Sequence, residues 1–275
     1  MRRIITAVVI LPFLIASILI SWLELLFVLL AGAAMVLGLA EFWKLAKLRG
    51  MNPEMGGGYL ASVALFMTFY YSDAADGSLI PMLVPVILII LTAGTLISFT
   101  VKGAGFDKML ASAGATILGV LYVALLGGYL VAVRTGFSSG LAADLLSFFF
   151  LVIFGADTGA YYVGRSFGKH KLAPTISPGK TWEGVLGGFV AALALAAVAH
   201  FWFFRPLPLR WALLLASAMT IIGIAGDLTE SALKRGAGSK DAATILPGHG
   251  GLLDRLDSLL FNAPVIYYFG RLYFG

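Results

Sequence analysis

The chain has 275 residues, of which 60% are hydrophobic and 12% are charged, and it carries a formal net charge of +5. This composition, with a mean hydropathy of +0.96, excludes a soluble globular domain and predicts an integral membrane protein with several spans. The sequence has no cysteine, which excludes disulfides, thiolate metal sites and a cysteine nucleophile.

Nine apolar segments recur along the chain, each near the length of about 20 residues that a bilayer requires. In chain order they cover residues 4–21, 23–42, 58–72, 79–100, 110–133, 145–164, 184–204, 211–227 and 252–273. The first follows two arginines as a signal peptide would, but no small-residue cleavage site leads from it into a soluble domain, so we interpret it as a retained span. The third is short and the last begins with charged residues, which leaves eight spans as an alternative. We expect an all-α, polytopic helical bundle with about nine transmembrane helices.

The basic residues predict the orientation of this bundle. If the N-terminus is cytoplasmic, 15 of the 19 lysines and arginines fall on the cytoplasmic side, and only Arg134, Arg205, Arg210 and Arg271 fall outside. This excess follows the positive-inside rule, so we expect a cytoplasmic N-terminus and an external C-terminus. The net positive charge then reflects topology and attraction to anionic lipid. Because no recognition helix or basic arm is present, we expect no nucleic-acid partner.

Residues 1–133 contain few groups suited to chemistry. Glu24 and Glu41 lie near the ends of spans, where an acid is ordinarily interfacial or solvated. Small residues such as Gly32 and Gly38 suit close helix packing in lipid. We therefore expect this region to be a scaffold of transmembrane helices that contacts a dimer partner or the lipid groove, and we expect the catalytic region in residues 134–275.

Two polar clusters fall on the predicted cytoplasmic side of the second half. Asp157 lies inside the sixth apolar segment, where a carboxylate needs a cation, a hydrogen-bond donor or water beside it, and Arg165 follows near the end of that segment. Residues 176–184, ISPGKTWEG, combine small residues, hydroxyls and a lysine ahead of a helix, as phosphate-binding loops do. The pattern is not a Walker A motif, because Pro174 stands where that motif requires glycine. An ordinary capped helix start is the alternative interpretation.

The densest cluster of charge lies in residues 231–257, with two further acids, Asp227 and Glu230, just before it. If the eighth helix continues into this cluster, Asp227, Glu230 and Lys234 share one face at spacings i, i+3 and i+7. Asp227 near a helix C-terminus is opposed by the helix dipole, so we expect it to have a cationic partner. Asp254 and Asp257 begin the ninth helix, and Asp227 and Asp254 can face each other across the helix pair. Their oxygens suit Mg²⁺, and the surrounding bases would allow a polyphosphate to bind through that metal.

These residue types favour phosphoryl or nucleotidyl transfer. In such reactions metal ions and basic side chains neutralise phosphate charge, and the remaining requirement is in-line positioning. His249, which lies between glycines, can be a general base, a phosphate ligand or a turn residue. The catalytic role ranks lowest, because a phosphate monoester nucleophile is already ionised near neutral pH.

The pattern S-x-L-K-R, four residues, K-D-x-A-x-x-L-P-x-H-G-G-L-x-D-R-L-D, from Ser231 to Asp257, resembles the signature of the phosphatidate cytidylyltransferases, also called CDP-diacylglycerol synthases. The upstream blocks DTGAY, from Asp157, and ISPGKTWEG, from Ile176, resemble other recurrent blocks of that family, although Gly179 stands where a lysine is common. The resemblance covers about residues 157–257 and the multi-span layout. The N-terminal half is supported by hydropathy alone.

The resemblance implies that the protein transfers CMP from CTP to phosphatidic acid, giving CDP-diacylglycerol and pyrophosphate, at the cytoplasmic face of the cell membrane. It also implies Mg²⁺ as cofactor, with room for a second cation, and a homodimer. Asp227 and Asp254 would bind the metal, with Asp257 close by. The other roles are our hypotheses: Lys180, Lys234, Arg235, Lys240 and Arg255 bind phosphates, Ser177 and Thr181 donate to phosphate oxygens, and Asp157 and Glu230 orient the bases or the metal-bound water. Arg165 and His249 are further candidates for substrate binding.

Two alternatives use the same residues. A CTP-dependent polyprenol kinase or a cytidylyltransferase for another lipid would keep the metal and phosphate groups and change the lipid groove. A transporter would use intramembrane acids such as Asp157 and Asp227 as ion sites between broken helices. Such a path requires charges in both leaflets, whereas the acids and bases here gather on one predicted side.

Overall fold

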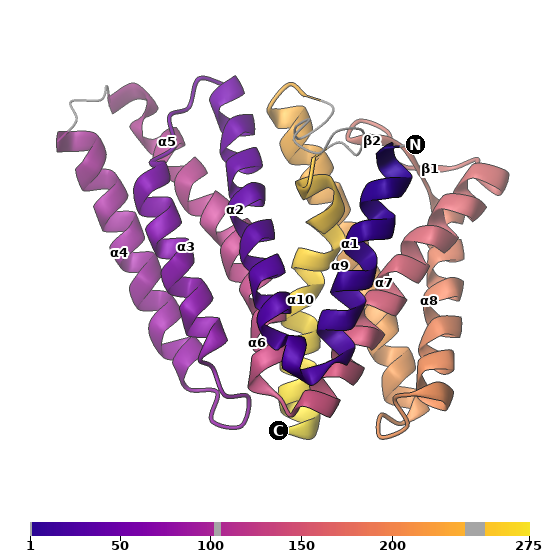
Figure 1. Cartoon of the computed structure of the whole chain (residues 1–275). Helices are drawn as coiled ribbons and strands as arrows, with labels where there is room; N and C mark the ends of the chain where they lie inside the picture. Colours follow the sequence, from indigo (N-terminus) through magenta and orange to yellow (C-terminus); the bar gives the residue numbers. More distant parts are fainter. Residues whose placement is uncertain (1, 102–105, 240–250) are drawn as a thin grey trace.

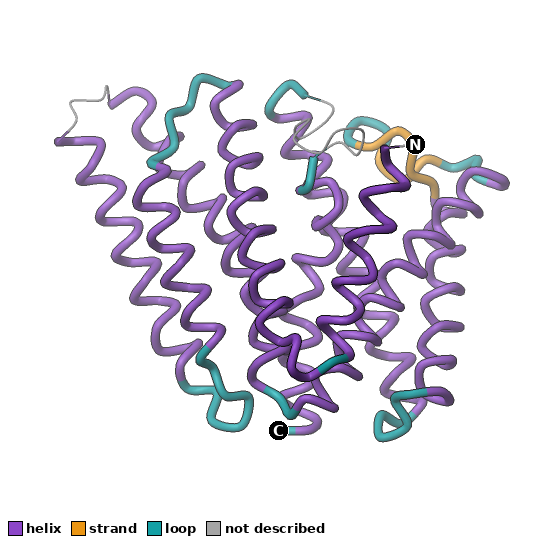
Figure 2. The backbone as a smooth tube through the Cα atoms, in the orientation of Figure 1, coloured by secondary structure: helices purple, strands orange, loops and turns teal. Residues whose placement is uncertain are grey.

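The computed structural model describes residues 2–101, 106–239 and 251–275, without the side chains of residues 2–10 and 106. Most of these residues are helical (Figure 2). The elements are α1 (Arg2–Leu19), η1 (Ser21–Leu23, a 3₁₀ turn), α2 (Glu24–Leu48), α3 (Met55–Tyr70), α4 (Leu79–Val101), α5 (Phe106–Gly119), η2 (Val120–Leu125, a π-helical segment), α6 (Leu126–Gly136), α7 (Ser139–Phe167), β1 (Lys171–Ala173), β2 (Ser177–Thr181), α8 (Trp182–Trp202), α9 (Leu209–Gly236) and α10 (Leu253–Phe274).

The helices run back and forth between two ends of a bundle (Figure 1). α1 begins at the end where strands β1 and β2 lie, and the chain finishes at the opposite end. Each of the nine predicted apolar segments coincides with a helix, the fifth with the continuous run of α5, η2 and α6. The prediction of an all-α polytopic membrane protein is therefore confirmed. Within the described residues, six helical stretches are long and apolar enough to cross a membrane, and the total span count and the orientation stay predictions.

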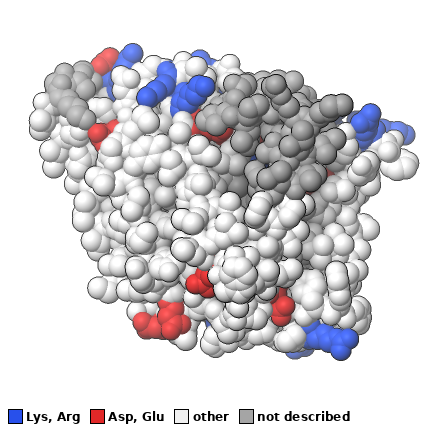
Figure 3. Space-filling model, viewed as in Figure 1, with Lys and Arg blue, Asp and Glu red and all other residues white. Residues whose placement is uncertain are grey.

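The middle of the bundle has an apolar surface. On the face seen in Figure 3, acidic and basic residues gather toward the two ends, with uncharged residues between them. α4 illustrates the reason, since Met82, Ile89, Ile90 and Ile97 on this helix are 61–67% exposed. Water would strongly disfavour a contiguous apolar surface of this kind, whereas lipid tails solvate it. This surface therefore indicates contact with the hydrocarbon core of a bilayer.

A two-stranded hairpin, which the sequence analysis did not anticipate, joins α7 to α8. β1 pairs antiparallel with β2, with Lys171 opposite Thr181. Thr181 is also the N-cap of α8, because its hydroxyl oxygen accepts the Gly184 N–H at 3.1 Å. The interpretation of residues 176–184 as a capped helix start is thus confirmed. The residues before the cap are extended, so they lie across the end of the bundle.

α7 and α8 approach each other backbone to backbone along small residues. A Cβ atom added to Gly159 on α7 would lie 2.6 Å from the Gly187 carbonyl oxygen on α8, and one added to Gly184 would lie 2.9 Å from the Ala160 carbonyl oxygen. Any side chain at these positions would separate the helices, which is why membrane helices use glycine at such contacts. This close packing fixes the start of α8, and therefore β2, against α7.

One of the two acids of α2 differs from the sequence-based expectation. Glu41 is completely buried, so the prediction of an interfacial or solvated residue is wrong for it. Glu24, which is partly exposed, binds Arg134 at 3.0 Å. Arg134 lies at the predicted outer end yet is only 1% exposed, and its guanidinium also donates to three backbone carbonyls at the end of α1 and in η1. Tertiary packing, rather than position at a span end, decides the environment of these charges.

Candidate active site

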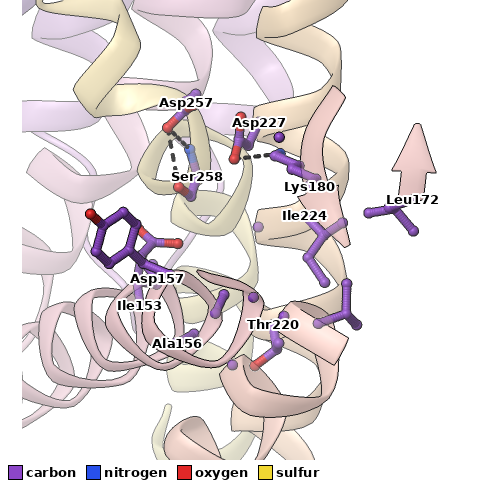
Figure 4. Close-up of a pocket in the computed structure, with 18 of the residues that line it drawn as sticks. Ile153, Ala156, Asp157, Leu172, Lys180, Thr220, Ile224, Asp227, Asp257 and Ser258 are labelled. Carbon is purple, nitrogen blue, oxygen red and sulfur yellow. Dashed lines mark hydrogen bonds and ion pairs between the residues drawn. The ribbon is translucent and has the colours of Figure 1, made fainter. Parts of the chain in front are cut away.

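A cavity of about 650 Å³ lies among α7, α8, α9, α10 and strand β2. Charged side chains from different elements face it: Asp157 on α7, Lys180 on β2, Asp227 on α9 and Asp257 on α10 (Figure 4). Apolar residues such as Ile224 complete the wall. Because four helices and a strand each contribute a wall, the cavity exists only in the assembled bundle.

Strand β2 brings a base to the acid of α9. Lys180 and Asp227 form an ion pair, drawn as a dashed line in Figure 4. Asp227 lies toward the C-terminal part of α9, where the helix dipole disfavours a negative charge. The expected cationic partner of Asp227 is therefore confirmed as Lys180.

Lys234 connects α9 with α10. Its ammonium nitrogen lies 2.6 Å from Glu230 Oε2, one turn earlier on α9, and donates to Asp254 Oδ1 at 2.7 Å. The other carboxylate oxygen of Asp254 accepts the Gly251 N–H at 2.9 Å, next to the start of α10. The predicted common face of Glu230 and Lys234 is confirmed by this contact. Asp254 is held by a base and a backbone donor.

Three acids gather where α9 and α10 face each other. One carboxylate oxygen from each of Asp227, Glu230 and Asp257 lies within 4.8 Å of the other two. Glu230 is 1% exposed, and its Oε1 is buried without a hydrogen-bond partner among the described residues. Ser258 donates to Asp257 Oδ1 through its N–H at 2.7 Å and its hydroxyl at 3.1 Å, and lies within hydrogen-bonding reach of Asp157.

Such crowding of carboxylates is costly, because like charges repel in a medium of low dielectric constant. A divalent cation with oxygen ligands would offset that repulsion and use the free oxygen of Glu230. The donor set is all oxygen, which suits Mg²⁺ rather than metals that prefer nitrogen or sulfur ligands. The residues of the cavity therefore fit a divalent cation.

Most of the predicted site residues line this one cavity. They are Asp157, Arg165, Lys180, Thr181, Asp227, Glu230, Lys234, Asp254, Arg255 and Asp257. Ser177 and Arg235 lie outside its lining, although the Arg235 guanidinium donates to the Ile176 carbonyl at 3.3 Å and so holds the hairpin against α9. Lys240 and His249 lie outside the described residues, and so does Asp241.

Some of these residues are already engaged in local contacts. The Thr181 hydroxyl oxygen is occupied as the cap of α8, and Arg165 donates to the Tyr161 hydroxyl at 2.8 Å. Glu183, which follows the cap, accepts the backbone N–H groups of Lys169 and His170 and lies 2.6 Å from the His170 ring. These contacts hold the hairpin in place, so their first role is to shape one wall of the cavity.

Three further residues near the acids were missed by the sequence analysis. Asn262 on α10 lines the cavity and is completely buried, with an unpartnered Oδ1 among the described residues. Ser258 contacts two acids, as described above. Tyr122, on the π-helical segment η2, is 4% exposed, and its hydroxyl has no partner within the described part of the chain. It lies close enough to Asp257 and the neighbouring acids to interact with them electrostatically. The signal for Asn262 is an amide inside an apolar span, whereas nothing local distinguishes Tyr122.

Comparison of the sequence with known proteins assigns the chain to a family. A sequence model of the cytidylyltransferase family matches residues 1–273. The phosphatidate cytidylyltransferase of Bacillus subtilis (strain 168) is 37% identical over 244 residues, which cover 88% of this chain and 87% of that protein. The protein of the same name from Pseudomonas aeruginosa is 38% identical over 271 residues (96% and 94%), and that of Synechocystis sp. is 30% identical over 259 residues (85% and 84%).

Proposed function

Because the chain belongs to the cytidylyltransferase family, we propose that it transfers CMP from CTP to phosphatidic acid within the cavity described above. The products of this nucleotidyltransferase reaction are CDP-diacylglycerol and pyrophosphate, so the protein acts in phospholipid biosynthesis. The observation that carries the proposal is the gathering of Asp227, Glu230 and Asp257 beside Lys180 and Lys234 in one cavity.

The reaction is an in-line displacement at phosphorus. A phosphate oxygen of the lipid forms a bond to the α-phosphorus of CTP, the bond from that phosphorus to the β-phosphate oxygen breaks, and pyrophosphate leaves with the electron pair. A phosphate monoester is largely dianionic near neutral pH, so the attacking oxygen needs no dedicated base. The task of the protein is therefore to bind, orient and neutralise the phosphates.

The bases of the cavity are suited to that task. Lys180, Lys234, Arg165 and Arg255 line it from β2, α9, α7 and α10, and they would contact phosphates from several directions. Lys180 and Lys234 now bind acids, which keeps both ammonium groups in place before the polyphosphate arrives. Ser177 and Arg235 would act at the rim of the cavity, and Lys240 and His249 remain proposed phosphate ligands on sequence grounds.

The acids would hold the cation. Asp227, Glu230 and Asp257 offer the clustered oxygens, and Asp254 stays a proposed ligand that Lys234 now binds. Mg²⁺ in this position would supply charge neutralisation at the phosphates. Asp157 completes the ring of carboxylates around the cavity, and a ring of this size has room for a second cation. Ser258, which contacts Asp257 and Asp157, would keep these two acids in their orientation.

We also propose that the cavity faces the cytoplasm. The hairpin end of the bundle carries the described members of the larger basic set, while Arg134, Arg205, Arg210 and Arg271 belong to the opposite end. CTP is a cytoplasmic nucleotide, and the lipid would enter laterally from the adjacent leaflet. A homodimer, implied by the family resemblance, stays a prediction.

The direct test is product formation by the purified, detergent-solubilised protein given phosphatidic acid and labelled CTP, with and without Mg²⁺. We expect a labelled CDP-lipid and pyrophosphate in equal amounts, only when Mg²⁺ is present. Release of CDP together with a phosphorylated polyprenol would instead identify a kinase. Flux of an ion through proteoliposomes in the absence of CTP would identify a transporter.

A further inference from the structure

The buried acid of α2 contacts the first turn of α10, more than 200 positions later in the chain. Glu41 Oε1 accepts the Leu252 N–H at 2.9 Å, and Glu41 Oε2 accepts the Leu253 N–H at 2.8 Å. The first N–H groups of a helix have no partner within the helix and form its positive end. α10 supplies no side-chain cap of its own at Leu252. Glu41 therefore caps α10 from outside, with both of its carboxylate oxygens.

The residue that caps the C-terminal end of α2 contacts the end of α9. Arg49 lies about two turns beyond Glu41, and its Nε donates to the carbonyl of Gly236, the last residue of α9, at 2.7 Å. Terminal carbonyls form the negative end of a helix, which favours a cation. The C-terminal end of α2 and its cap thus place an acid at the positive, N-terminal end of α10 and a base at the negative, C-terminal end of α9.

These two helix ends carry four acids of the cavity. Asp227 and Glu230 precede Gly236 on α9, and Asp254 and Asp257 follow Leu253 on α10. The contacts between them that the structure describes are short: Lys234 binds both Glu230 and Asp254, and Asp227, Glu230 and Asp257 share a cluster. A small shift of the first turn of α10 would therefore change the spacing of every carboxylate pair across the two helices.

We propose that Glu41 is a positioning residue for the acid cluster. It holds the first turn of α10 against α2 and so sets the distance of Asp254 and Asp257 from the acids of α9, while Arg49 holds the end of α9. The inference rests on the proposed function, in which these acids hold Mg²⁺. It gives residues 1–133, expected to be a scaffold, a direct part in the geometry of the site.

Glu41→Ala tests this, with Glu24→Gln as the matched control. Glu24 is the acid at the opposite end of the same helix, and neither it nor its ion-pair partner Arg134 lines the cavity. Glu41→Gln is a second variant, because an amide keeps one acceptor oxygen and so provides a folded protein if Glu41→Ala does not fold. All variants are made in the full-length chain.

The contact itself is measured by hydrogen exchange at the Leu252 and Leu253 amides, followed in overlapping peptides that begin several residues before Leu252. We expect faster exchange in Glu41→Ala at the first turn of α10, because two buried N–H groups lose their acceptors, and unchanged exchange there in Glu24→Gln. The effect on the cation site is measured by following the melting temperature as the Mg²⁺ concentration is raised, because this readout does not depend on turnover. We expect the Mg²⁺ concentration for the half-maximal shift to rise about 10-fold in Glu41→Ala, as for residues that orient metal ligands, and about 3-fold in Glu41→Gln.

A lower melting temperature with an unchanged Mg²⁺ requirement would assign Glu41 a merely structural role and overturn the proposal. Unchanged exchange at the first turn of α10 would overturn it as well. Formation of CDP-lipid by the wild-type protein is assayed separately. Its absence would refute the proposed function, while the exchange and Mg²⁺ titrations would still decide whether Glu41 positions a cation site.

Discussion

Two basic residues at opposite ends of the bundle, one buried and one partly buried, differ in what surrounds them. Arg134, at the predicted outer end, is 1% exposed and binds three backbone carbonyls and one acid, Glu24. Lys234, at the hairpin end, binds Glu230 and Asp254 beside a cavity that holds further acids. Around Arg134 the charges and hydrogen bonds are matched. Around Lys234 the acids are in excess, and a buried oxygen of Glu230 has no partner among the described residues.

This difference distinguishes a charged residue that stabilises the fold from charged residues that form a binding site. A buried charge whose partners are all present contributes to a single folded arrangement, and removing it leaves other buried groups unpaired. A buried cluster of like charges beside a cavity lowers the stability of the protein, because the charges repel one another. A ligand that binds in the cavity relieves this repulsion, so such a cluster indicates a binding site. The four predictions below test this contrast, from the largest expected effect to the smallest.

Asp227→Asn and Asp254→Asn should abolish turnover and keep the fold. Each removes a charged ligand from the proposed cation site, and we expect a loss of about 1,000-fold or more in CDP-lipid formation, equivalent to about 4 kcal/mol. The melting temperature should change little, because each variant removes a repelling carboxylate charge and at the same time weakens one ion pair, with Lys180 or with Lys234. Near-normal turnover at saturating Mg²⁺ would refute the assigned role, and an unfolded variant would show that the cluster is structural after all.

Arg134→Met should show the opposite pattern. The apolar side chain keeps much of the volume but leaves the acid and three carbonyls without their donor, so we expect a loss of about 3–5 kcal/mol in the free energy of unfolding. Turnover per folded molecule should stay within about 2-fold of the wild-type value, since the residue is not in the cavity. Chemical denaturation and an activity titration of the folded fraction measure the two quantities. A loss of turnover per folded molecule without a loss of stability would contradict the purely structural role of Arg134.

Tyr122→Phe tests an unmatched group from the N-terminal half. The hydroxyl is buried without a partner among the described residues, so its removal should leave stability unchanged or raise it by up to about 1 kcal/mol. Because the hydroxyl lies near the acids, it could donate to a bound phosphate oxygen or to water in the cavity, and we expect loss of that one hydrogen bond to lower turnover by about 3- to 10-fold. Thermal melting and initial rates measure the effects. Unchanged turnover would mean that the unpartnered hydroxyl of Tyr122 has no part in the reaction.

Lys44→Ala should change least. Lys44 is exposed on α2, one turn beyond Glu41, and its charge is screened by water and salt. We expect rates within about 2-fold and a free energy of unfolding within about 0.5 kcal/mol of the wild-type values. The variant also separates a specific role of Glu41 and Arg49 from a general effect of charge on α2. A large loss of rate would show that the rim of the cavity extends further over the N-terminal half than the described contacts indicate.

The sequence by itself determined the features that depend on short stretches of chain. Lipid requires continuous apolar segments of helical length, so each of the nine segments could be recognised locally, and each is helical. Helical periodicity likewise places Glu230 and Lys234 one turn apart on α9, and they form the expected contact. The spaced pattern from Ser231 to Asp257 was enough to indicate the family, which the comparisons confirm.

Only the tertiary structure decided which distant residues meet. Glu41 looked like an ordinary acid at the end of a span, and it is the close packing of α2 against the start of α10 that makes it a buried cap. Lys180 reaches Asp227 because the hairpin folds over the cavity, and Tyr122 approaches the acids because η2 packs beside α10. The physical reason is that hydropathy and periodicity act within a helix, whereas the pairing of charges depends on the angles and distances at which helices pack.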